Sequence, residues 1–389
     1  MKPRLVVSMI ATLCAGAAMA SAFIAKASAA TAPVAYAFVS TANPNNVSTL
    51  AVSSTGSFTH VGTASSPTTI YHLSVTKNFL FGIDNLSNIY TYSISSTGSL
   101  KLVATTNAGQ YVSGFSSQYS AAVTQVDSAG STIYTMVGTS QTNWYMESFK
   151  IESNGQLQFL GTSYADPNAL NQIRFVQGGQ FAVTDGCYNT APGASFTTDS
   201  DDVNDIVTYK HESNGFLTYV ATSNDAPTAQ SPYEYCASLN ASDSSNHFAV
   251  GFTIFNPPGD DIEPGFALGT YTVNTSGTPA TTSSYENMPV TSVGDPYTMG
   301  IDPTGKILAV GGEGSFQLYH FNGANPITAY SGVIQTNDLI RNIAWDKGSH
   351  MYLLTDHSVD IYNISTTSYT ELKPWEFTAP YSMIVLSLQ

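Results

Sequence analysis

The chain has 389 residues, of which 42% are hydrophobic, 12% are aromatic and only 10% are charged. Acidic residues outnumber basic residues by 27 to 12, which gives a formal net charge of −15. This composition excludes a disordered chain, which would carry fewer aromatic residues and more charge, and a coiled coil, which would be rich in Glu, Lys and Leu. It also argues against nucleic acid as a partner, because neutralising phosphates requires clustered Lys and Arg side chains.

A secretory signal peptide is predicted over residues 1–29. Lys2 and Arg4 form a short basic region, an apolar stretch runs from Leu5 to Ala20, and small residues suited to cleavage follow. The apolar run of about 16 residues is shorter than the roughly 20 that a membrane-spanning helix needs. We therefore expect a secreted or periplasmic protein without a membrane anchor, whose residues 30–389 form a single domain.

The mature chain is strongly acidic. Removing residues 1–29 takes three basic residues from the 12 and leaves 9 against 27 acidic residues, a net charge of −18. Such a surface repels anionic membranes and nucleic acid, so we expect a soluble monomer that binds neither. Two cysteines remain, Cys187 and Cys236. Because export permits disulfides, we predict a bridge between them, with two buried thiols as the alternative.

A repeated strand and turn pattern runs through the mature chain. Alternating strand segments such as Tyr90–Ile94 precede turns that place a glycine, or its equivalent, where a tight hairpin needs a positive φ angle. Successive markers lie 42 to 62 residues apart, and a blade of four short strands needs about 40 to 50 residues. Seven markers therefore predict seven blades, with longer loops in the third to fifth blades. The markers are Gly56, Gly98, Gly155, Gly215, Gly277, Gly323 and Thr367.

The two ends of the mature chain complete this scheme. The first unit, from Ala35 to Val61, lacks an inner strand of its own, and the last segment, Tyr381–Leu386, is a strand without a blade. Pairing the two closes the ring and removes the exposed strand edges. The sequence therefore predicts an all-β, seven-bladed β-propeller that is closed by its C-terminal strand.

The blade sequences resemble those of lactonase-like seven-bladed propellers, the family that contains 6-phosphogluconolactonase and carboxymuconate-lactonising enzymes. The resemblance is carried by Tyr36–Asn43 with Val47–Gly56, and by Ile301–Val310. It implies a hydrolase that opens a cyclic ester of a sugar or an organic acid at the mouth of the central channel. A sugar-phosphate substrate is not expected, because the mature chain holds only two arginines and is separated from the cytoplasm.

Local motifs of hydrolases and nucleotide enzymes are absent, so candidate site residues come from the predicted inner strands, whose starts converge on the channel. A lactonase needs a base that activates water and a cation that holds the developing oxyanion. We expect His72 or Glu234 to act as the base and Arg174, Tyr297 and Arg341 to bind the substrate. The alternative is that these polar residues pair only with one another and with water.

A non-catalytic propeller that binds a ligand or a protein is the competing functional hypothesis. Four aromatic residues near the long loops could form its binding face, or could pack between blades. They are Trp144, Tyr145, Tyr188 and Phe255. Two acidic segments, 199–205 and 259–263, offer oxygen ligands but lack the spacing of a calcium-binding loop. We therefore expect no metal site and no cofactor.

Overall fold

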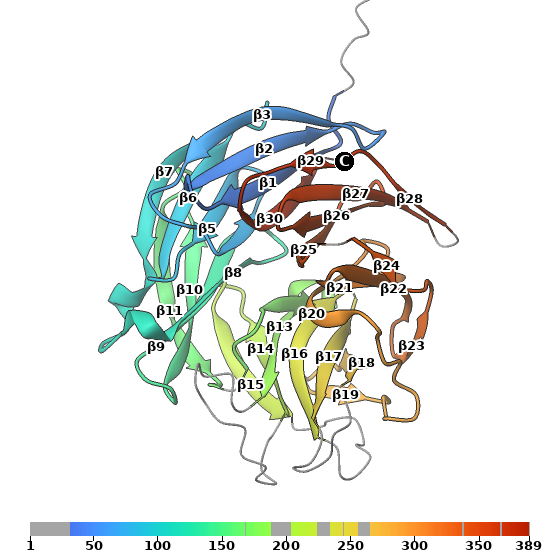
Figure 1. Ribbon diagram of the computed structural model, residues 1–389. Helices are drawn as coiled ribbons and strands as arrows, with labels where there is room; N and C mark the ends of the chain where they lie inside the picture. The colour runs from blue at the N-terminus through green and yellow to red at the C-terminus, as the bar shows by residue number, and fades with distance from the viewer. Residues whose placement is uncertain are drawn as a thin grey trace, which may run out of the picture. The chain divides into compact units, whose positions relative to one another are not determined.

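Alternating apolar residues fold the chain into seven antiparallel sheets that are arranged in a ring (Figure 1). The computed structural model describes residues 32–167, 169–187, 204–223, 234–243, 245–255, 265–336, 338–365 and 368–388. Residues Pro33–Gln389 belong to one unit. Within the described residues, each sheet contains four strands in chain order, apart from the first sheet and two short additions. The prediction of seven blades is confirmed; the predicted leader and marker Thr367 lie outside the described residues.

The first blade consists of β1 (Ala35–Thr41), β2 (Asn46–Val52), β3 (Phe58–Ser65) and the last strand, β30 (Pro380–Ser387). The second contains β4 (His72–Val75), β5 (Phe79–Ile83), β6 (Asn88–Ile94) and β7 (Leu100–Asn107). The third contains β8 (Ser120–Val126), β9 (Thr132–Gly138), β10 (Trp144–Ile151) and β11 (Leu157–Ala165). The fourth contains β12 (Arg174–Val176), β13 (Phe181–Cys187), β14 (Asn204–His211) and β15 (Leu217–Ser223).

The fifth blade contains β16 (Glu234–Ser242), β17 (His247–Phe255), β18 (Phe266–Val273) and β19 (Pro279–Thr281). The sixth contains β20 (Gly294–Ile301), β21 (Ile307–Glu313), β22 (Ser315–Asn322), β23 (Asn325–Ala329) and the short β24 (Ile334–Gln335). The seventh contains β25 (Ile340–Trp345), β26 (His350–Thr355), β27 (Ser358–Ile364), β28 (Tyr369–Glu371) and the short β29 (Trp375–Glu376). Short 3₁₀ helices cover Ala108–Tyr111, Ser117–Tyr119 and Gln177–Gly179.

The last strand closes the ring as predicted. β30 pairs antiparallel with β1, from Ala35 opposite Ser387 to Thr41 opposite Pro380. The buried Ser40 hydroxyl donates to the Ile70 carbonyl oxygen at 3.0 Å and accepts the Ser382 N–H at 3.0 Å. The closure is therefore tied to the entry of the second blade as well as to β1.

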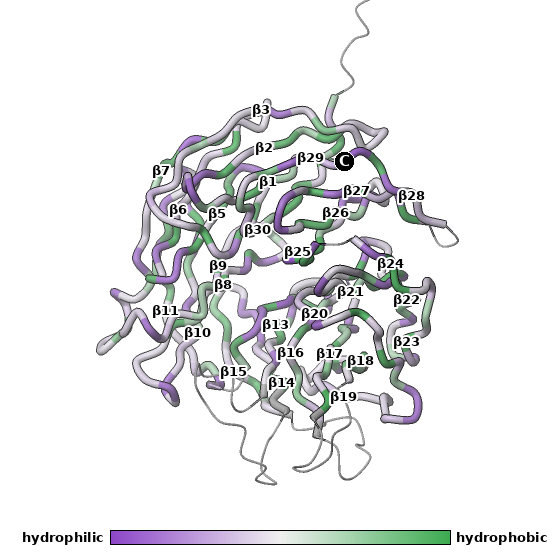
Figure 2. The backbone as a smooth tube through the Cα atoms, viewed as in Figure 1, coloured by the Kyte–Doolittle hydropathy of each residue, from purple (hydrophilic) through white to green (hydrophobic). Residues whose placement is uncertain are grey.

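Apolar cores lie between neighbouring blades. Between the first and second blades, Tyr36 and Phe38 pack with Leu80 and Tyr92, and all four are buried. Equivalent clusters recur around the ring, and Figure 2 shows hydrophobic residues along the strands of the blades. Because each sheet contributes side chains to the cores on both of its faces, the blades hold one another in place and fix the inner strands around the channel.

Candidate functional site

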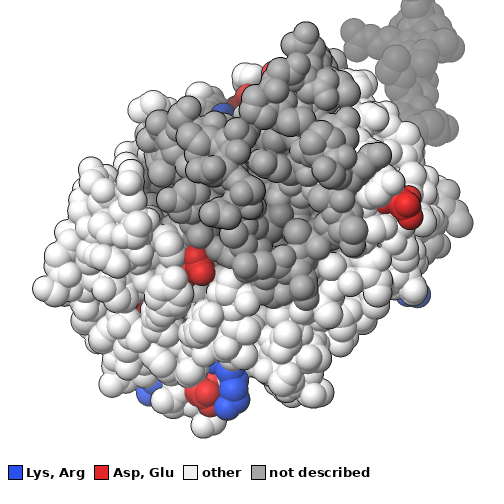
Figure 3. Space-filling model, turned by 90° about the horizontal axis from the view of Figure 1, so that it is seen from below, with Lys and Arg blue, Asp and Glu red and all other residues white. Residues whose placement is uncertain are grey.

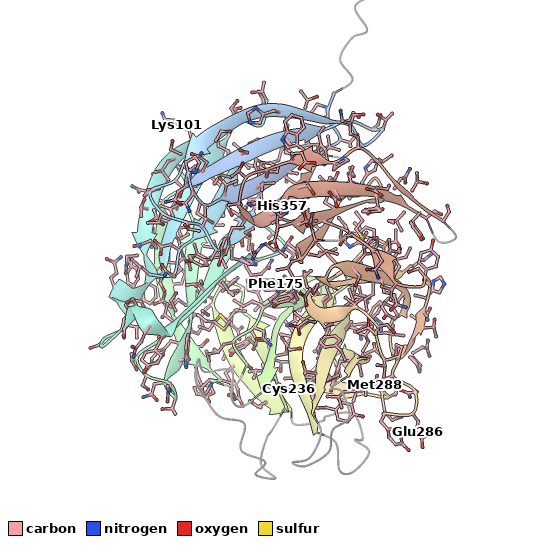
Figure 4. The ribbon with its side chains drawn as sticks, in the orientation of Figure 1. Lys101, Phe175, Cys236, Glu286, Met288 and His357 are labelled. Carbon is pink, nitrogen blue, oxygen red and sulfur yellow. The ribbon has the colours of Figure 1, made fainter. Side chains whose placement is uncertain are left out.

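The inner segments of all seven blades surround a cavity of about 520 Å³. Its lining includes His72 and Val75 from the second blade, Gln172 and Arg174 from the fourth, and Trp345 from the seventh. Figure 4 labels Phe175, the neighbour of Arg174 on β12, near the middle of the ring. The volume suits a small organic molecule, because ligand sites in proteins commonly measure about 300–1,000 Å³.

Arg174 supplies a cation to this cavity. It begins β12, and its Nη2 donates to the side-chain oxygen of Gln172. Burial lowers the pKa of Arg174 to about 10, while the nearby Asp185 carboxylate acts to raise it. The guanidinium therefore remains charged at neutral pH, and with one Nη2 contact to Gln172 it keeps further N–H donors for a ligand.

Asp185 lies close enough to Arg174 for their charges to interact, and it is not predicted from the sequence. It belongs to β13, is 1% exposed and accepts a hydrogen bond from the Asn240 amide of the fifth blade. Burial raises the pKa of Asp185 to about 7, against the opposing effects of the Asn240 hydrogen bond and the Arg174 charge. The same Asn240 amide donates to the Gln172 carbonyl oxygen at 3.1 Å. These contacts hold the segment that carries Arg174. The only sequence signal for this residue was an acidic side chain inside a buried strand.

His72 faces the cavity as a neutral ring. Burial, together with the charge of Arg174, lowers its pKa to about 4. The Thr124 N–H donates to Nδ1 at 3.4 Å, so we assign the ring proton to Nε2. His72 can then offer an N–H to a ligand, but with this low pKa it is a weak base.

The other predicted site residues are placed differently. Arg341 donates through Nε to Asp356 Oδ1 at 2.5 Å and lies over the Tyr381 ring, 5.7 Å from its centroid. Tyr297 is 52% exposed, and neither Tyr297 nor Arg341 is among the residues that line the cavity. Glu234 begins β16, and its side chain lies outside the described residues. The structure thus brings together His72 and Arg174.

Cys236 is disulfide-bonded and lies near the start of β16, as Figure 4 shows. Cys187 ends β13, the strand that packs beside β16, but its side chain lies outside the described residues. The Cys187–Cys236 pairing therefore stays a prediction. Of the proposed binding aromatics, Trp144 is buried in the core between the third and fourth blades, while Tyr188 lies outside the described residues.

The described residues contain neither a cluster of metal ligands nor a membrane-spanning helix. Among them, no group of three or more His, Cys, Asp or Glu side chains is placed to hold a metal ion. Segment 259–263 and residues 199–203 lie outside the described residues. Among the described residues of the face in Figure 3, charged side chains are few and scattered. No helix in the described ranges is long and apolar enough to cross a membrane.

No protein-family model matches the sequence, and no curated protein matches it. Solved structures do match. A protein from Lactobacillus plantarum aligns with a TM-score of 0.66 at 10% identity, covering 91% of this chain and 99% of that one. A functionally unknown protein from Desulfotomaculum acetoxidans aligns with a TM-score of 0.57 at 12% identity, over 91% and 99% of the two chains.

A chain of Kuenenia stuttgartiensis hydrazine synthase aligns with a TM-score of 0.56 at 13% identity, over 88% of this chain and 94% of that one. The chain has the fold of a seven-bladed β-propeller. At such low identities the likeness extends to the fold alone, so the function of this propeller must be argued from its own cavity.

Proposed function

We propose that the protein is an exported propeller whose central cavity binds a small organic acid or its cyclic ester. The observation that supports this proposal is a charged Arg174 inside a cavity that is open to ligand-sized molecules. Guanidinium groups recognise carboxylates through paired, charge-assisted hydrogen bonds. His72 adds a neutral N–H donor from the second blade, so two donors from different blades serve one oxygen-rich group.

Hydrolysis of a lactone is the second candidate function. In this reaction water adds to the carbonyl carbon, the ring C–O bond breaks, and a hydroxy acid is released. Arg174 and the His72 Nε2–H suit the developing oxyanion. The low pKa of His72 makes it a poor base, and Asp185 is buried and does not line the cavity, so neither suits the activation of a water molecule there. Glu234, which is predicted from the sequence, is therefore the remaining candidate for water activation.

The binding site can be tested by titration calorimetry of the mature protein with a panel of lactones and their hydroxy acids. We expect Arg174→Gln to weaken carboxylate binding by about 10- to 100-fold, since a hydrogen bond to a charged group contributes about 1.5–3 kcal/mol. Arg341→Gln is the matched control, because this arginine is paired with Asp356 away from the cavity. Unchanged binding by Arg174→Gln would contradict the proposal.

Proton release from the same lactones separates the two candidates. Turnover above the spontaneous rate that is lost in Glu234→Gln supports hydrolysis. Binding of the acids without turnover supports a binding protein. If the wild-type protein neither binds nor hydrolyses any member of the panel, both candidates are wrong.

A further inference from the structure

The cavity has two chemically different sides. The second to fifth blades contribute mainly polar side chains, and the sixth, seventh and first blades contribute mainly apolar ones. On the polar side the partly exposed lining residues are His72, Val75, Gln125, Gln172, Arg174, Ser242 and Asp243, of which only Val75 is apolar. On the apolar side the partly exposed lining residues are Gly300, Ile301, Asp302, Asn342, Ala344, Trp345, Ile384 and Val385, and Pro303 and Lys347 are exposed, so three of these ten residues are polar.

Trp345 is the largest element of the apolar side. It ends β25, the inner strand of the seventh blade, and packs against the inner strand of the sixth. A Cβ at Gly300 would lie 3.3 Å from Trp345 Nε1 and 3.3 Å from Ile343 Cγ2, so the absence of a side chain at Gly300 lets the indole lie close to β20. The largely buried Met299 and Ile343 also line this side of the cavity.

The acidic groups at the edge of the cavity are occupied by their own turns. Asp302 Oδ1 accepts the N–H groups of Lys306 and Ile307, both at 2.7 Å. Asp243 Oδ1 accepts the Ser245 N–H at 2.8 Å. These carboxylates hold the turns that follow β20 and β16, so they are poorly suited to bind the hydroxyl groups of a sugar.

A sugar acid carries a hydroxyl group on nearly every carbon, and burying these groups against an apolar wall without hydrogen-bond partners is unfavourable. An acid with a hydrocarbon body instead matches both sides of the cavity. We infer that the ligand is an amphipathic monocarboxylate, an aryl or alkyl acid, with its carboxylate at Arg174 and its apolar body against Trp345, Ile301 and Val385. This inference rests on the proposed carboxylate site.

The test compares phenylacetate, hexanoate and gluconate by titration calorimetry on the mature protein. We expect phenylacetate and hexanoate to bind at least 10-fold more tightly than gluconate. Trp345→Gln should lower the affinity for phenylacetate by about 10-fold, while Trp345→Phe should retain most of it. Trp375→Phe is the matched control, because Trp375 stacks near His60 outside the cavity.

Val385→Thr provides a nearly isosteric second variant should Trp345→Gln fail to fold, and it should also weaken phenylacetate binding selectively. If gluconate binds as tightly as the two apolar acids and its binding depends on Arg174, the inference of an amphipathic ligand is wrong, whereas the proposed carboxylate site is supported. If none of the three acids binds, the inference is overturned together with the carboxylate site. Equal losses for gluconate and phenylacetate in Val385→Thr would also overturn the inference.

Discussion

Glu147 is a fully buried acidic side chain that has no hydrogen-bond partner among the described residues. It lies in β10, is 0% exposed, and neither of its carboxyl oxygens has a hydrogen-bond partner within the described residues. By strand alternation it shares a face with Tyr145 and Phe149, which contribute to the core between the second and third blades. Burial raises its pKa to about 8 from the usual 4.5, so the carboxyl is protonated at neutral pH.

This shift predicts that the protein loses stability as the pH rises. Below pH 4.5 the carboxyl is protonated in both the folded and the unfolded protein. Between pH 4.5 and pH 8 the unfolded chain releases the proton, whereas the folded chain retains it. The free energy of unfolding should therefore fall across this range, by on the order of 4 kcal/mol from this group. Urea denaturation at pH 5 and pH 9 should show a smaller loss for Glu147→Gln than for wild type.

Glu152→Gln is the control for this prediction, because Glu152 is an exposed side chain that pairs with Lys150 on the surface. It should leave the pH dependence of stability unchanged. A wild-type protein whose pH dependence equals that of Glu147→Gln would show that the Glu147 carboxyl ionises in the folded state at its usual pKa.

Two residues of the cavity could be predicted because the inner strands start at similar positions in successive repeats. His72 and Arg174 each precede a strand-opening phenylalanine by seven residues, and both line the cavity. Asp185 could not be predicted, because its relation to Arg174 depends on Asn240, which packs against it from the next blade. Glu147 is similar: strand alternation gives the direction of its side chain, but only the packed blades show that no described residue pairs with it.

At the scale of the elements, the turn glycines join neighbouring blades. Gly98, Gly155 and Gly277 have φ angles of +83°, +85° and +88°. A Cβ at these positions would lie 2.5 to 2.8 Å from Tyr36, Phe79 and Phe181 respectively, each an aromatic ring of the preceding blade. Glycine is therefore required for two reasons. The turn needs a positive φ, and the aromatic ring of the preceding blade occupies the space that a side chain would fill.

Gly98→Ala should accordingly destabilise the fold through both effects. We expect about 1–2 kcal/mol from the left-handed backbone and a further 1–3 kcal/mol from displacing Tyr36. Gly314→Ala isolates the first effect, because Gly314 has a φ of +66° and a Cβ there would have no atom of the described residues within 4 Å. Urea unfolding at one pH measures both variants, and equal losses of stability would show that the Tyr36 contact contributes nothing.

These glycines explain how far the blade count could be predicted. Each marks the outer turn of a blade, and the conformational demand on it leaves a sequence signal even where loop lengths vary. The seventh marker, Thr367, lies outside the described residues, yet β25 to β28 form the seventh blade. The short strands β24 and β29 were not predicted, because runs of two residues are too brief for an alternating pattern.

At the scale of the whole molecule, the ring depends on its last strand. β30 contributes the inner strand of the first blade, and Met383 is buried in the core with the seventh blade. Without β30, the paired edge of β1 would expose its backbone N–H and C=O groups. Such an edge is a template for pairing with other chains.

Deleting residues 380–389 should therefore produce self-association and a lower unfolding midpoint. Size-exclusion chromatography with light scattering and urea denaturation measure the two effects. Deleting only residues 388–389 is the control: it removes the Leu388 N–H donation to Val34 but keeps the β1–β30 ladder, so we expect a monomer. A monomeric 380–389 deletion with a wild-type unfolding midpoint would show that the ring does not need this strand.

The closure also sets an order of events during synthesis. Ala35 pairs with Ser387, so the two partners are 352 positions apart along the chain. At about 5–20 residues per second, a ribosome needs roughly 20–70 s to supply that interval. The second to seventh blades are each continuous in sequence and can form as they emerge. The blade that is translated first is thus completed last. Until β30 is translated, the edge of β1 that will pair with it is open to pairing with other nascent chains.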